Sequence, residues 1–210
     1  TYTMGAADED PEADDWEKPA HSETVADFMI GETQVTQELW RAVLGKKSYK
    51  FTSDLQCPIR SVSWIDCQTF IQTLNYMTGQ KFRMPSEVEW KYAACGGNQN
   101  KGYKNAGSKD ADAVTRHDAN NEDEIHPVKT NQPNELGIYD MSGNVKEWCS
   151  DKYGSYPSSS QTNPTGPSSG SKRVLRGGAS GSHEKACRVS ARSYNSPGEQ
   201  SSRYGLRLAL

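Results

Sequence analysis

Cysteine is the residue type in this chain with the widest chemistry, because a thiolate binds metals, attacks carbonyls and can be oxidised. The five cysteines are Cys57, Cys67, Cys95, Cys149 and Cys187. No two of them form a C-x-x-C pair, and none has a histidine at zinc-ligand spacing, which argues against a structural zinc site. Their odd number argues against a dense disulfide framework. We therefore expect buried free thiols.

The usual signatures of hydrolytic and phosphate-binding enzymes are missing from the sequence. There is no G-x-S-x-G, no H-E-x-x-H, no P-loop and no histidine cluster. His183 beside Glu184 is the one acid–base pair near the late glycines Gly177 and Gly178. Because adjacent residues usually point apart, an exposed loop histidine is favoured over a general base.

Two segments are rich in oxygen atoms that can hold a cation. The first runs from Asp8 to Glu17 (DEDPEADDWE), and the second, residues 117–124, combines His117 with aspartate, asparagine and glutamate. The first segment lacks the spacing of an EF-hand loop. A solvated loop is the favoured interpretation of each segment, and cation binding is the alternative.

The composition fits one domain with a modest, aromatic-rich core. The chain has 210 residues, a net charge of −3, 33% hydrophobic residues and a mean hydropathy of −0.87. Five Trp and ten Tyr nevertheless supply large apolar area per residue. We expect a single domain over residues 1–210 with long polar loops.

Charge and hydropathy exclude two classes of partner. The charge is near balance and no basic helix face recurs, which argues against nucleic acid binding. No apolar run is long enough to span a bilayer. The chain opens on TYTMGAADED, which is not a signal-peptide pattern, but Thr1 is not an initiator methionine, so an exported precursor stays open. We favour an exported, cell-surface or phage-associated location over a cytoplasmic one.

Capping residues and apolar spacing predict the helices that must position the loops. Thr36 precedes QELWRAVLG, which predicts a short helix over residues 36–44. Ser63 opens the strongest helical pattern in the chain, over residues 63–78. Ser86 begins a third, shorter helix with another S-x-x-E cap.

The remaining ordered segments are predicted to be strands joined by polar loops. Residues 82–84 predict a short strand, and the pieces RVLRGG, CRVSAR and YGLRLAL within residues 173–210 alternate apolar and basic residues as short buried strands do. The Ser/Pro/Gly segment 158–171 is predicted to be a loop that buries nothing useful. Function is expected in the small polar loops between the late strands.

Taken together, these segments resemble the formylglycine-generating enzyme family, also called the sulfatase-modifying-factor domain. The resemblance rests on GETQVTQELW, PIRSVSWIDC, RMPSEVEWKYAACGG, NELGIYDMSGNVKEW, RVLRGG, CRVSAR and YGLRLAL, in the family's order from about Met4 to Leu210. It implies an α+β domain with a C-type lectin-like fold, little regular secondary structure, two main helices and a central antiparallel sheet. Ile71 and Leu208 stand where animal members place a disulfide, so an apolar contact is expected here.

The resemblance also carries an expectation about oxidase activity. The name-giving enzymes oxidise a substrate cysteine to formylglycine with two copper-binding cysteines in the segment after R-G-G. Here Ser182 takes the first position, and Cys187 is the single cysteine between Arg173 and Leu210, better explained as the Cys of CRVSAR. A serine hydroxyl does not replace a soft thiolate on copper(I). We expect neither copper binding nor this oxidase activity.

Calcium is the one cofactor that the resemblance leaves open, and none is required. In the G-N-x-x-E-W motif, Asn144 and Glu147 offer side-chain oxygens and Val145 a backbone carbonyl, a set that fits part of a calcium shell. The alternative is that Asn144 and Glu147 tie down a tight turn beside Trp148. The family's second calcium site is doubtful, because the corresponding stretch DANNEDE lacks its Trp.

A second branch with this fold comprises the variable proteins of diversity-generating retroelements, in which adenine-containing codons near the C-terminus are mutated to diversify ligand binding. Residues 173–210 are similar in layout, with fixed-looking strands framing two loops rich in Ser, Gly, Tyr and Asn. Glu184, Lys185, Glu199 and Gln200 are not readily reached from such codons, so they must be scaffold or they count against this interpretation. Ala179-Ser180 replaces the Ser-Trp usual after R-G-G, which favours a flatter, polar surface.

The predicted ligand-binding surface combines tyrosine with small polar residues, as adaptable paratopes do. Its members are Ala179, Ser180, Ser182, His183, Lys185, Arg192, Tyr194, Asn195, Glu199, Gln200, Ser201 and Tyr204. The favoured function is a non-catalytic module that binds an unidentified protein or glycan, in its sharpest form a retroelement variable protein. The alternatives are an enzyme of the family with different chemistry and a structural or assembly domain of a bacterial surface.

Overall fold

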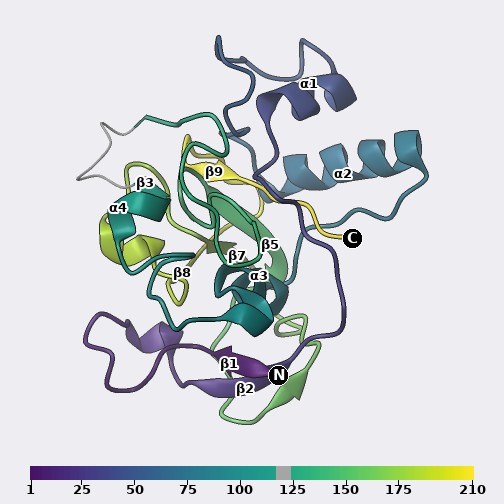
Figure 1. Ribbon diagram of the computed structural model, residues 1–210. Coiled ribbons are helices and arrows are strands. Elements are labelled where there is room, and N and C mark those ends of the chain that lie inside the picture. Colours follow the sequence, from purple (N-terminus) through teal and green to yellow (C-terminus); the bar gives the residue numbers. More distant parts are fainter. Residues whose placement is uncertain (117–123) are drawn as a thin grey trace.

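The helices begin where the capping residues predict. A computed structural model describes residues 1–116 and 124–210 (Figure 1). Thr36, Ser63 and Ser86 each accept a backbone N–H of the first helical turn. The helices are α1 (Gln37–Leu44), α2 (Trp64–Thr78), α3 (Glu87–Ala94) and α4 (Ala111–Val114), with 3₁₀ turns η1 (Asp15–Glu17), η2 (Gly97–Gln99) and η3 (Glu184–Cys187). In the second oxygen-rich segment, for which a solvated loop is favoured and cation binding is the alternative, residues 117–123 lie outside the described residues.

A four-stranded sheet in the order β8-β7-β5-β9 forms the centre of the molecule. It is built from β5 (Lys146–Lys152), β7 (Arg173–Arg176), β8 (Arg192–Asn195) and β9 (Tyr204–Gly205). β5, β7 and β8 are antiparallel neighbours, whereas β9 joins β5 in parallel. The α+β fold with a central, largely antiparallel sheet is thus confirmed. The predicted strand at residues 82–84 is wrong, since Arg83 forms only a single bridge with Ala209.

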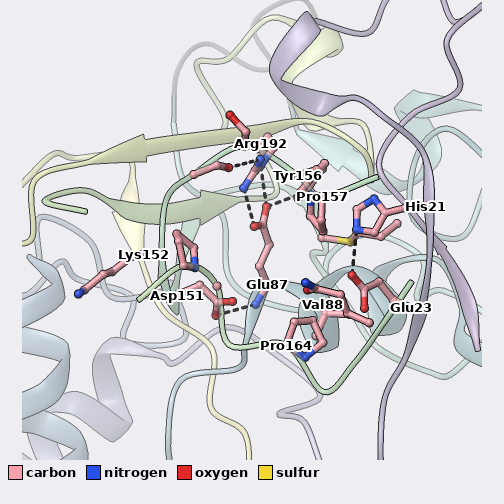
Figure 2. A pocket seen from close by; sticks show the side chains of 16 residues that line it. His21, Glu23, Glu87, Val88, Asp151, Lys152, Tyr156, Pro157, Pro164 and Arg192 are labelled. Atoms are coloured by element: carbon pink, nitrogen blue, oxygen red, sulfur yellow. Dashed lines mark hydrogen bonds and ion pairs between the residues drawn. The ribbon is translucent and has the colours of Figure 1, made fainter. Parts of the chain in front are cut away.

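Two smaller sheets lie beside the central one. β3 (Thr115–Arg116) pairs with β4 (Ser142–Gly143), and β1 (Tyr2–Met4) pairs with β2 (His21–Thr24), which also pairs with β6 (Gln161–Thr162). β6 comes from the Ser/Pro/Gly segment and both of its residues are exposed, so this segment contains a short strand but buries little, as predicted. Its Pro164 lines a cavity beside β2 (Figure 2). A proline ring gives apolar surface without an N–H that needs a partner.

The acidic N-terminal segment is largely exposed, but its last residue is buried against the rest of the protein. Glu17 is 1% exposed and its Oε1 lies 2.8 Å from a guanidinium nitrogen of Arg188. Asp14 pairs with Lys185 of η3 at 2.7 Å. Because a buried cation needs a counter-charge, Glu17 is held beside Arg188, whereas Asp8, Glu9 and Asp15 are exposed as the predicted solvated loop requires.

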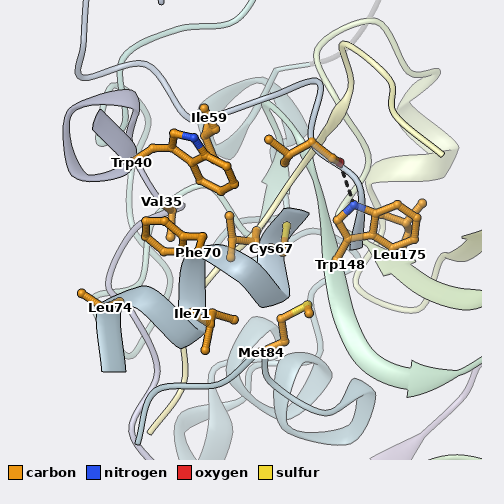
Figure 3. Close-up of a cluster of buried hydrophobic side chains, with 12 residues drawn as sticks. Val35, Trp40, Ile59, Cys67, Phe70, Ile71, Leu74, Met84, Trp148 and Leu175 are labelled. Atoms are coloured by element: carbon orange, nitrogen blue, oxygen red, sulfur yellow. Dashed lines mark hydrogen bonds between the residues drawn. The ribbon is translucent and has the colours of Figure 1, made fainter. Parts of the chain in front are cut away.

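Side chains alternate across the strands, so the central sheet carries an apolar cluster on each face. Trp148 and Leu175 lie in the cluster that α1 and α2 cover, where Trp40 stacks on Phe70 with ring centroids 4.7 Å apart (Figure 3). Their sequence neighbours Cys149 and Val174 lie in the second cluster with Trp90 of α3. Ile71 and Leu208 both belong to the first cluster, as the predicted apolar contact requires.

Candidate functional site

The arginines of the late strands are buried and matched, so they belong to the framework. Arg176 donates to the carbonyls of Ser190 and Ala191, and Arg207 pairs with Glu147. Both guanidinium side chains are at most 1% exposed. A buried cation is tolerated only when it is paired and hydrogen-bonded. Arg176 and Arg207 therefore hold the fold together and are unavailable to a ligand.

The turn after the R-G-G motif requires glycine. Gly177 and Gly178 have φ of 93° and 71°, in the left-handed region that other residues avoid. A Cβ on Gly178 would lie 2.5 Å from Sγ of Cys187. The turn is therefore pressed against Cys187, and the loop that leads to η3 starts from a fixed point.

Ser182 and Cys187 stand in the segment where the related oxidases keep their cysteines, and both are buried. The Ser182 hydroxyl accepts the N–H of Ala179 at 3.1 Å, and the Ser182 N–H donates to the Ala179 carbonyl at 2.8 Å. Cys187 is 0% exposed, and none of the five cysteines forms a disulfide; four are buried, as predicted, and Cys95 is half-buried. Ser182 therefore closes a tight turn while Cys187 packs beneath Gly178.

A cavity of about 190 Å³ opens between this loop, β5, β8 and the acidic segment. His183 and Lys185 line it from the loop, and Lys146 and Ser193 line it from the sheet. Lys146 is half-buried, with Nζ 3.4 Å from Oγ of Ser193, and its burial lowers the pKa of the ammonium group. Lys146 is not among the binding residues predicted from the sequence. Its position one residue before Glu147 on a strand is the signal that places it on the opposite face.

The second late loop is anchored to the N-terminus of α2. Its Gln200 donates to Asp66 Oδ2 at 2.7 Å, and the Ser201 carbonyl accepts the N–H of Ser61 at 3.0 Å. At its base Asn195 donates to the Tyr204 hydroxyl at 3.0 Å. Glu199 and Gln200 are exposed and Ser201 is half-buried. The loop is thus an ordered surface, as the binding interpretation requires.

Tyr194 lies on a different face of the sheet from Tyr204. Its ring is 47% exposed and packs on Tyr153, with centroids 4.1 Å apart and Lys172 above it. Tyr204 instead packs edge-on against Trp148. Neighbouring strand positions point to opposite faces of a sheet, so Asn195 lies on the same face as Tyr204, whereas Tyr194 lies on the other face. The two tyrosines therefore cannot form one paratope.

Four members of the predicted binding surface are inside the protein. Ala179 is 0%, Ser180 3%, Ser182 7% and Arg192 6% exposed. Arg192 donates to both carboxylate oxygens of Glu87, at 2.9 and 2.7 Å, and to the carbonyl of Gly154. Their selection as exposed contact residues is wrong, because the strand register and the R-G-G turn direct them inward. The exposed or half-buried members are His183, Lys185, Tyr194, Asn195, Glu199, Gln200, Ser201 and Tyr204.

Glu147, the predicted carboxylate ligand of calcium, is surrounded by N–H donors. Its Oε1 accepts from Gln34 at 3.0 Å and from Arg207 at 2.9 Å. Its Oε2 accepts from the Trp90 indole at 2.6 Å and from Arg207 at 3.0 Å. A second cation beside these atoms would face the guanidinium at close range. Glu147 therefore does not fit a calcium ligand in this arrangement.

The other two predicted calcium ligands also have protein partners. Asn144 exchanges hydrogen bonds with the backbone of His126, at 3.2 and 3.1 Å, and the Val145 carbonyl accepts from Gln34 at 2.9 Å. This geometry matches the alternative, in which the motif ties down a turn. Within residues 1–116 and 124–210, no group of three or more His, Cys, Asp or Glu is arranged to hold a metal ion. Calcium binding stays a prediction.

Comparison with known proteins identifies the family. The model of the sulfatase-modifying factor enzyme 1-like domain matches residues 1–210. The chain belongs to this family. The formylglycine-generating enzyme of Streptomyces coelicolor is 34% identical over 187 residues, which cover 81% of this chain and 57% of that enzyme. That of Mus musculus is 36% identical over 170 residues, covering 72% of this chain and 44% of the mouse protein. The chain thus spans about half the length of these two family relatives.

Solved structures of the family's fold agree with the architecture described above. The variable protein 1 of Treponema denticola superposes with a TM-score of 0.86 at 28% sequence identity, covering 99% of this chain and 91% of that chain. PvdO from Pseudomonas aeruginosa superposes with a TM-score of 0.83 at 23% identity over 99% of this chain and 90% of its own. The C-type lectin-like fold of the sulfatase-modifying factor family is therefore present over the whole chain. No helix in its described part has the length and apolar character that crossing a membrane demands.

Proposed function

We propose that this family member is a non-catalytic module that binds a protein or glycan through its two late loops. The observation that carries the proposal is the pair Ser182 and Cys187. The hydroxyl of Ser182 is tied into a turn, and the single thiol of the segment is buried beneath Gly178. Copper(I) held by two thiolates needs two soft sulfur ligands, and this segment offers one.

The surface left by these changes has the character of a binding face. His183 and Lys185 line the cavity beside Lys146, and Glu199 and Gln200 extend the face on the other late loop. Exposed polar groups on loops that are fixed by buried arginines give a specific surface with little ordering cost. Tyr194 stands apart with Tyr153 and Lys172, so it forms a second, smaller contact point.

The sharpest form of the proposal is a variable protein of a diversity-generating retroelement at a cell or phage surface. The similarity to the Treponema variable protein over nearly the whole chain supports it. Sequencing the DNA around the coding region tests it directly. We expect a near-identical repeat of the C-terminal codons that differs only at adenines, together with a reverse transcriptase. If the surrounding DNA lacks both, the retroelement form is wrong.

Copper and peptide turnover test the non-catalytic part of the proposal. The chain is titrated with copper(I) against a chromogenic copper(I) chelator, and a cysteine-containing sulfatase peptide is incubated with it under air. We expect no copper capture and no aldehyde product. Tight copper binding that Cys187→Ser removes, or any conversion of the peptide cysteine, would overturn the proposal.

A second candidate is an enzyme of the family with different chemistry, and Lys146 is the observation that favours it. A cavity lysine with a lowered pKa is a better nucleophile at neutral pH than an exposed one. The 34% identity to the Streptomyces enzyme is consistent with a catalytic ancestry. Reaction with an aromatic aldehyde followed by borohydride tests it. Selective labelling of Lys146 ahead of the exposed lysines is expected of an enzyme, and uniform labelling is expected of a binding module.

A further inference from the structure

A second cavity, of about 270 Å³, lies outside the late-loop face (Figure 2). Its walls come from β2, from the start of α3 and from residues 151–167. Arg192 lines both this cavity and the one beside Lys146, so its side chain stands between them. Ser155, Gln161 and Pro167 are exposed lining residues, so the cavity meets solvent at the Ser/Pro/Gly segment. Its volume suits a small molecule.

His21 and Glu23 form a buried pair on one wall. His21 Nδ1 lies 3.0 Å from the carbonyl of Pro19, which can only accept, so Nδ1 carries a proton. His21 Nε2 lies 2.9 Å from Glu23 Oε1. One proton therefore lies between the two side chains, as imidazolium with carboxylate or as imidazole with carboxylic acid. Both arrangements leave the pair uncharged overall, and in both Glu23 Oε2 can only accept a hydrogen bond.

Glu23 Oε2 has no hydrogen-bond partner in the described part of the chain, although the residue is only 2% exposed. A buried oxygen without a donor costs about 1–3 kcal/mol. Glu23 lines the cavity, so a molecule within it is the available source of that donor. The missing partner is an N–H or O–H group.

Asp151 is a second buried carboxyl group in the lining of this cavity. It is 4% exposed, and its Oδ2 accepts from the Glu87 N–H and the Ser150 hydroxyl, both at 2.9 Å. Burial, followed by the charge of Glu87, raises the pKa of Asp151 to about 7. A cation placed beside Asp151 would relieve both effects.

The arginine and the lysine of the lining already have hydrogen-bond partners within the protein. Arg192 is paired with both oxygens of Glu87, and Lys152 donates to the carbonyl of Ser168 at 2.6 Å and points away from the cavity in Figure 2. Apart from Ser155 and Gln161 at the opening, the rest of the wall is apolar or aromatic, with Tyr156 among its members. The cavity thus presents the unpartnered oxygen of Glu23 and the carboxyl group of Asp151, neither of which has a cationic side chain of the lining as its partner.

We propose that this cavity binds a primary ammonium group carried on a short apolar stem, with Glu23 and Asp151 as its two acceptors. An ammonium group has three N–H donors and a positive charge, which meet the free oxygen of Glu23 and the carboxylate of Asp151. The apolar stem fits against the ring of Tyr156. A bare metal ion is disfavoured, because the described residues contain no metal-ligand group of three. The site is separate from the late loops and does not depend on their function.

Calorimetry on the full chain tests the site with n-butylammonium chloride as the probe. Two control molecules separate the contributions: 1-butanol keeps the stem without the charge, and tetramethylammonium keeps the charge without N–H donors. We expect n-butylammonium to bind more tightly than either control by about tenfold or more, since a hydrogen bond to a charged group is worth that much. Equal binding of 1-butanol would overturn the proposal.

Variants assign the binding to the two carboxyl groups. Glu23→Gln and Asp151→Asn are each expected to weaken n-butylammonium binding by about tenfold. Glu32→Gln is the matched control, because that carboxylate is 56% exposed and pairs with Lys129. Asn at position 151 keeps the acceptor for Glu87 and Ser150, so this variant folds even if Glu23→Gln does not, and circular dichroism checks both. Unchanged binding in Asp151→Asn would overturn the proposal.

The ammonium can belong to a free amine or to a lysine of a partner, and a further arm separates these sources. Nα-acetyl-lysine amide carries the same ammonium and stem on a peptide unit. Binding equal to that of n-butylammonium assigns the site to lysine side chains, whereas binding of n-butylammonium alone assigns it to small free amines. If neither compound binds, the proposal is wrong.

Discussion

Glu147 and Asp151 lie four residues apart on β5, and both are buried carboxyl groups, yet their surroundings differ. Glu147 receives four N–H donors, two of them from the guanidinium of Arg207. Asp151 receives two neutral donors on one oxygen and faces the charge of Glu87. The pairing of β5 with β7 is also irregular between Trp148 and Lys152, so the strand changes course between the two groups.

The difference separates framework from site. A carboxylate whose two oxygens are fully hydrogen-bonded, in part by a buried cation, fixes the positions of the elements that carry the donors. A carboxyl group left without a counter-ion raises the free energy of its charged form, which is a cost that a ligand can relieve. The same residue class on the same strand therefore has a structural role at one end and a candidate binding role at the other.

The largest expected effect comes from removing the charge of Glu147, the carboxylate paired with Arg207. Glu147→Gln leaves the Arg207 guanidinium buried without its counter-charge, so we expect the free energy of unfolding to fall by about 3–5 kcal/mol. Urea unfolding followed by tryptophan fluorescence measures it. Glu32→Gln removes an exposed partner of Lys129 and is expected to cost about 0–1 kcal/mol. Similar losses in the two variants would contradict the structural role of Glu147.

Removing the charge of Asp151 is expected to change the free energy of unfolding in the opposite direction. The folded-state pKa of Asp151 is about 7, above its ordinary value, so the native state holds a proton that the unfolded state has lost between about pH 4 and pH 7. Stability from this group is thus present at low pH and lost as pH rises through about 7. Asp151→Asn keeps the neutral form at every pH and should stabilise the protein by about 2–4 kcal/mol at pH 8.

Unfolding curves of Asp151→Asn at pH 5 and pH 8 check the sign. The charges that act on Asp151 are those of Glu87, Glu89 and Arg173, and they stay in place in the variant. The gain in unfolding free energy should be larger at pH 8 than at pH 5. A loss at pH 8, or a gain that is the same at both values, would show that Asp151 is charged and matched in the native state.

Two tryptophan variants test how much the indole hydrogen bond to Glu147 contributes to stability. Trp90→Phe removes the indole N–H that lies 2.6 Å from Oε2, whereas Trp40→Phe removes a buried indole N–H without a partner among the described residues. Both rings are at most 3% exposed, so the lost apolar contact is comparable. Trp90→Phe should therefore cost about 1–3 kcal/mol more than Trp40→Phe in urea unfolding. Equal costs would mean that the charged hydrogen bond contributes nothing.

The smallest effect is expected from a chelator. Because Glu147 has no oxygen free of N–H donors, calcium removal with EGTA should leave the melting temperature unchanged. Any ion bound to the native state raises that temperature by mass action, so the measurement is direct. A clear fall in EGTA, restored by added calcium, would establish the calcium site that the G-N-x-x-E-W motif predicts.

The sequence by itself determines the features that depend on neighbouring residues. The starts of α1, α2 and α3 follow from Thr36, Ser63 and Ser86, whose hydroxyls cap backbone N–H groups within the next turn. The absence of a second cysteine after the R-G-G motif is likewise a property of the sequence alone. Family motifs add the fold, because they occur in order along the whole chain.

Only the tertiary structure decides which of the charged residues are buried beside a counter-ion. Arg207 finds Glu147 across 60 positions and Arg192 finds Glu87 across 105, so no local pattern predicts that these charges are buried and used. The same holds for Glu23 and Asp151, which the sequence offers as ordinary acidic residues. Burial and the nearness of a counter-ion arise when distant strands and loops meet, and these two quantities decide whether a charged group is part of the framework or open to a ligand.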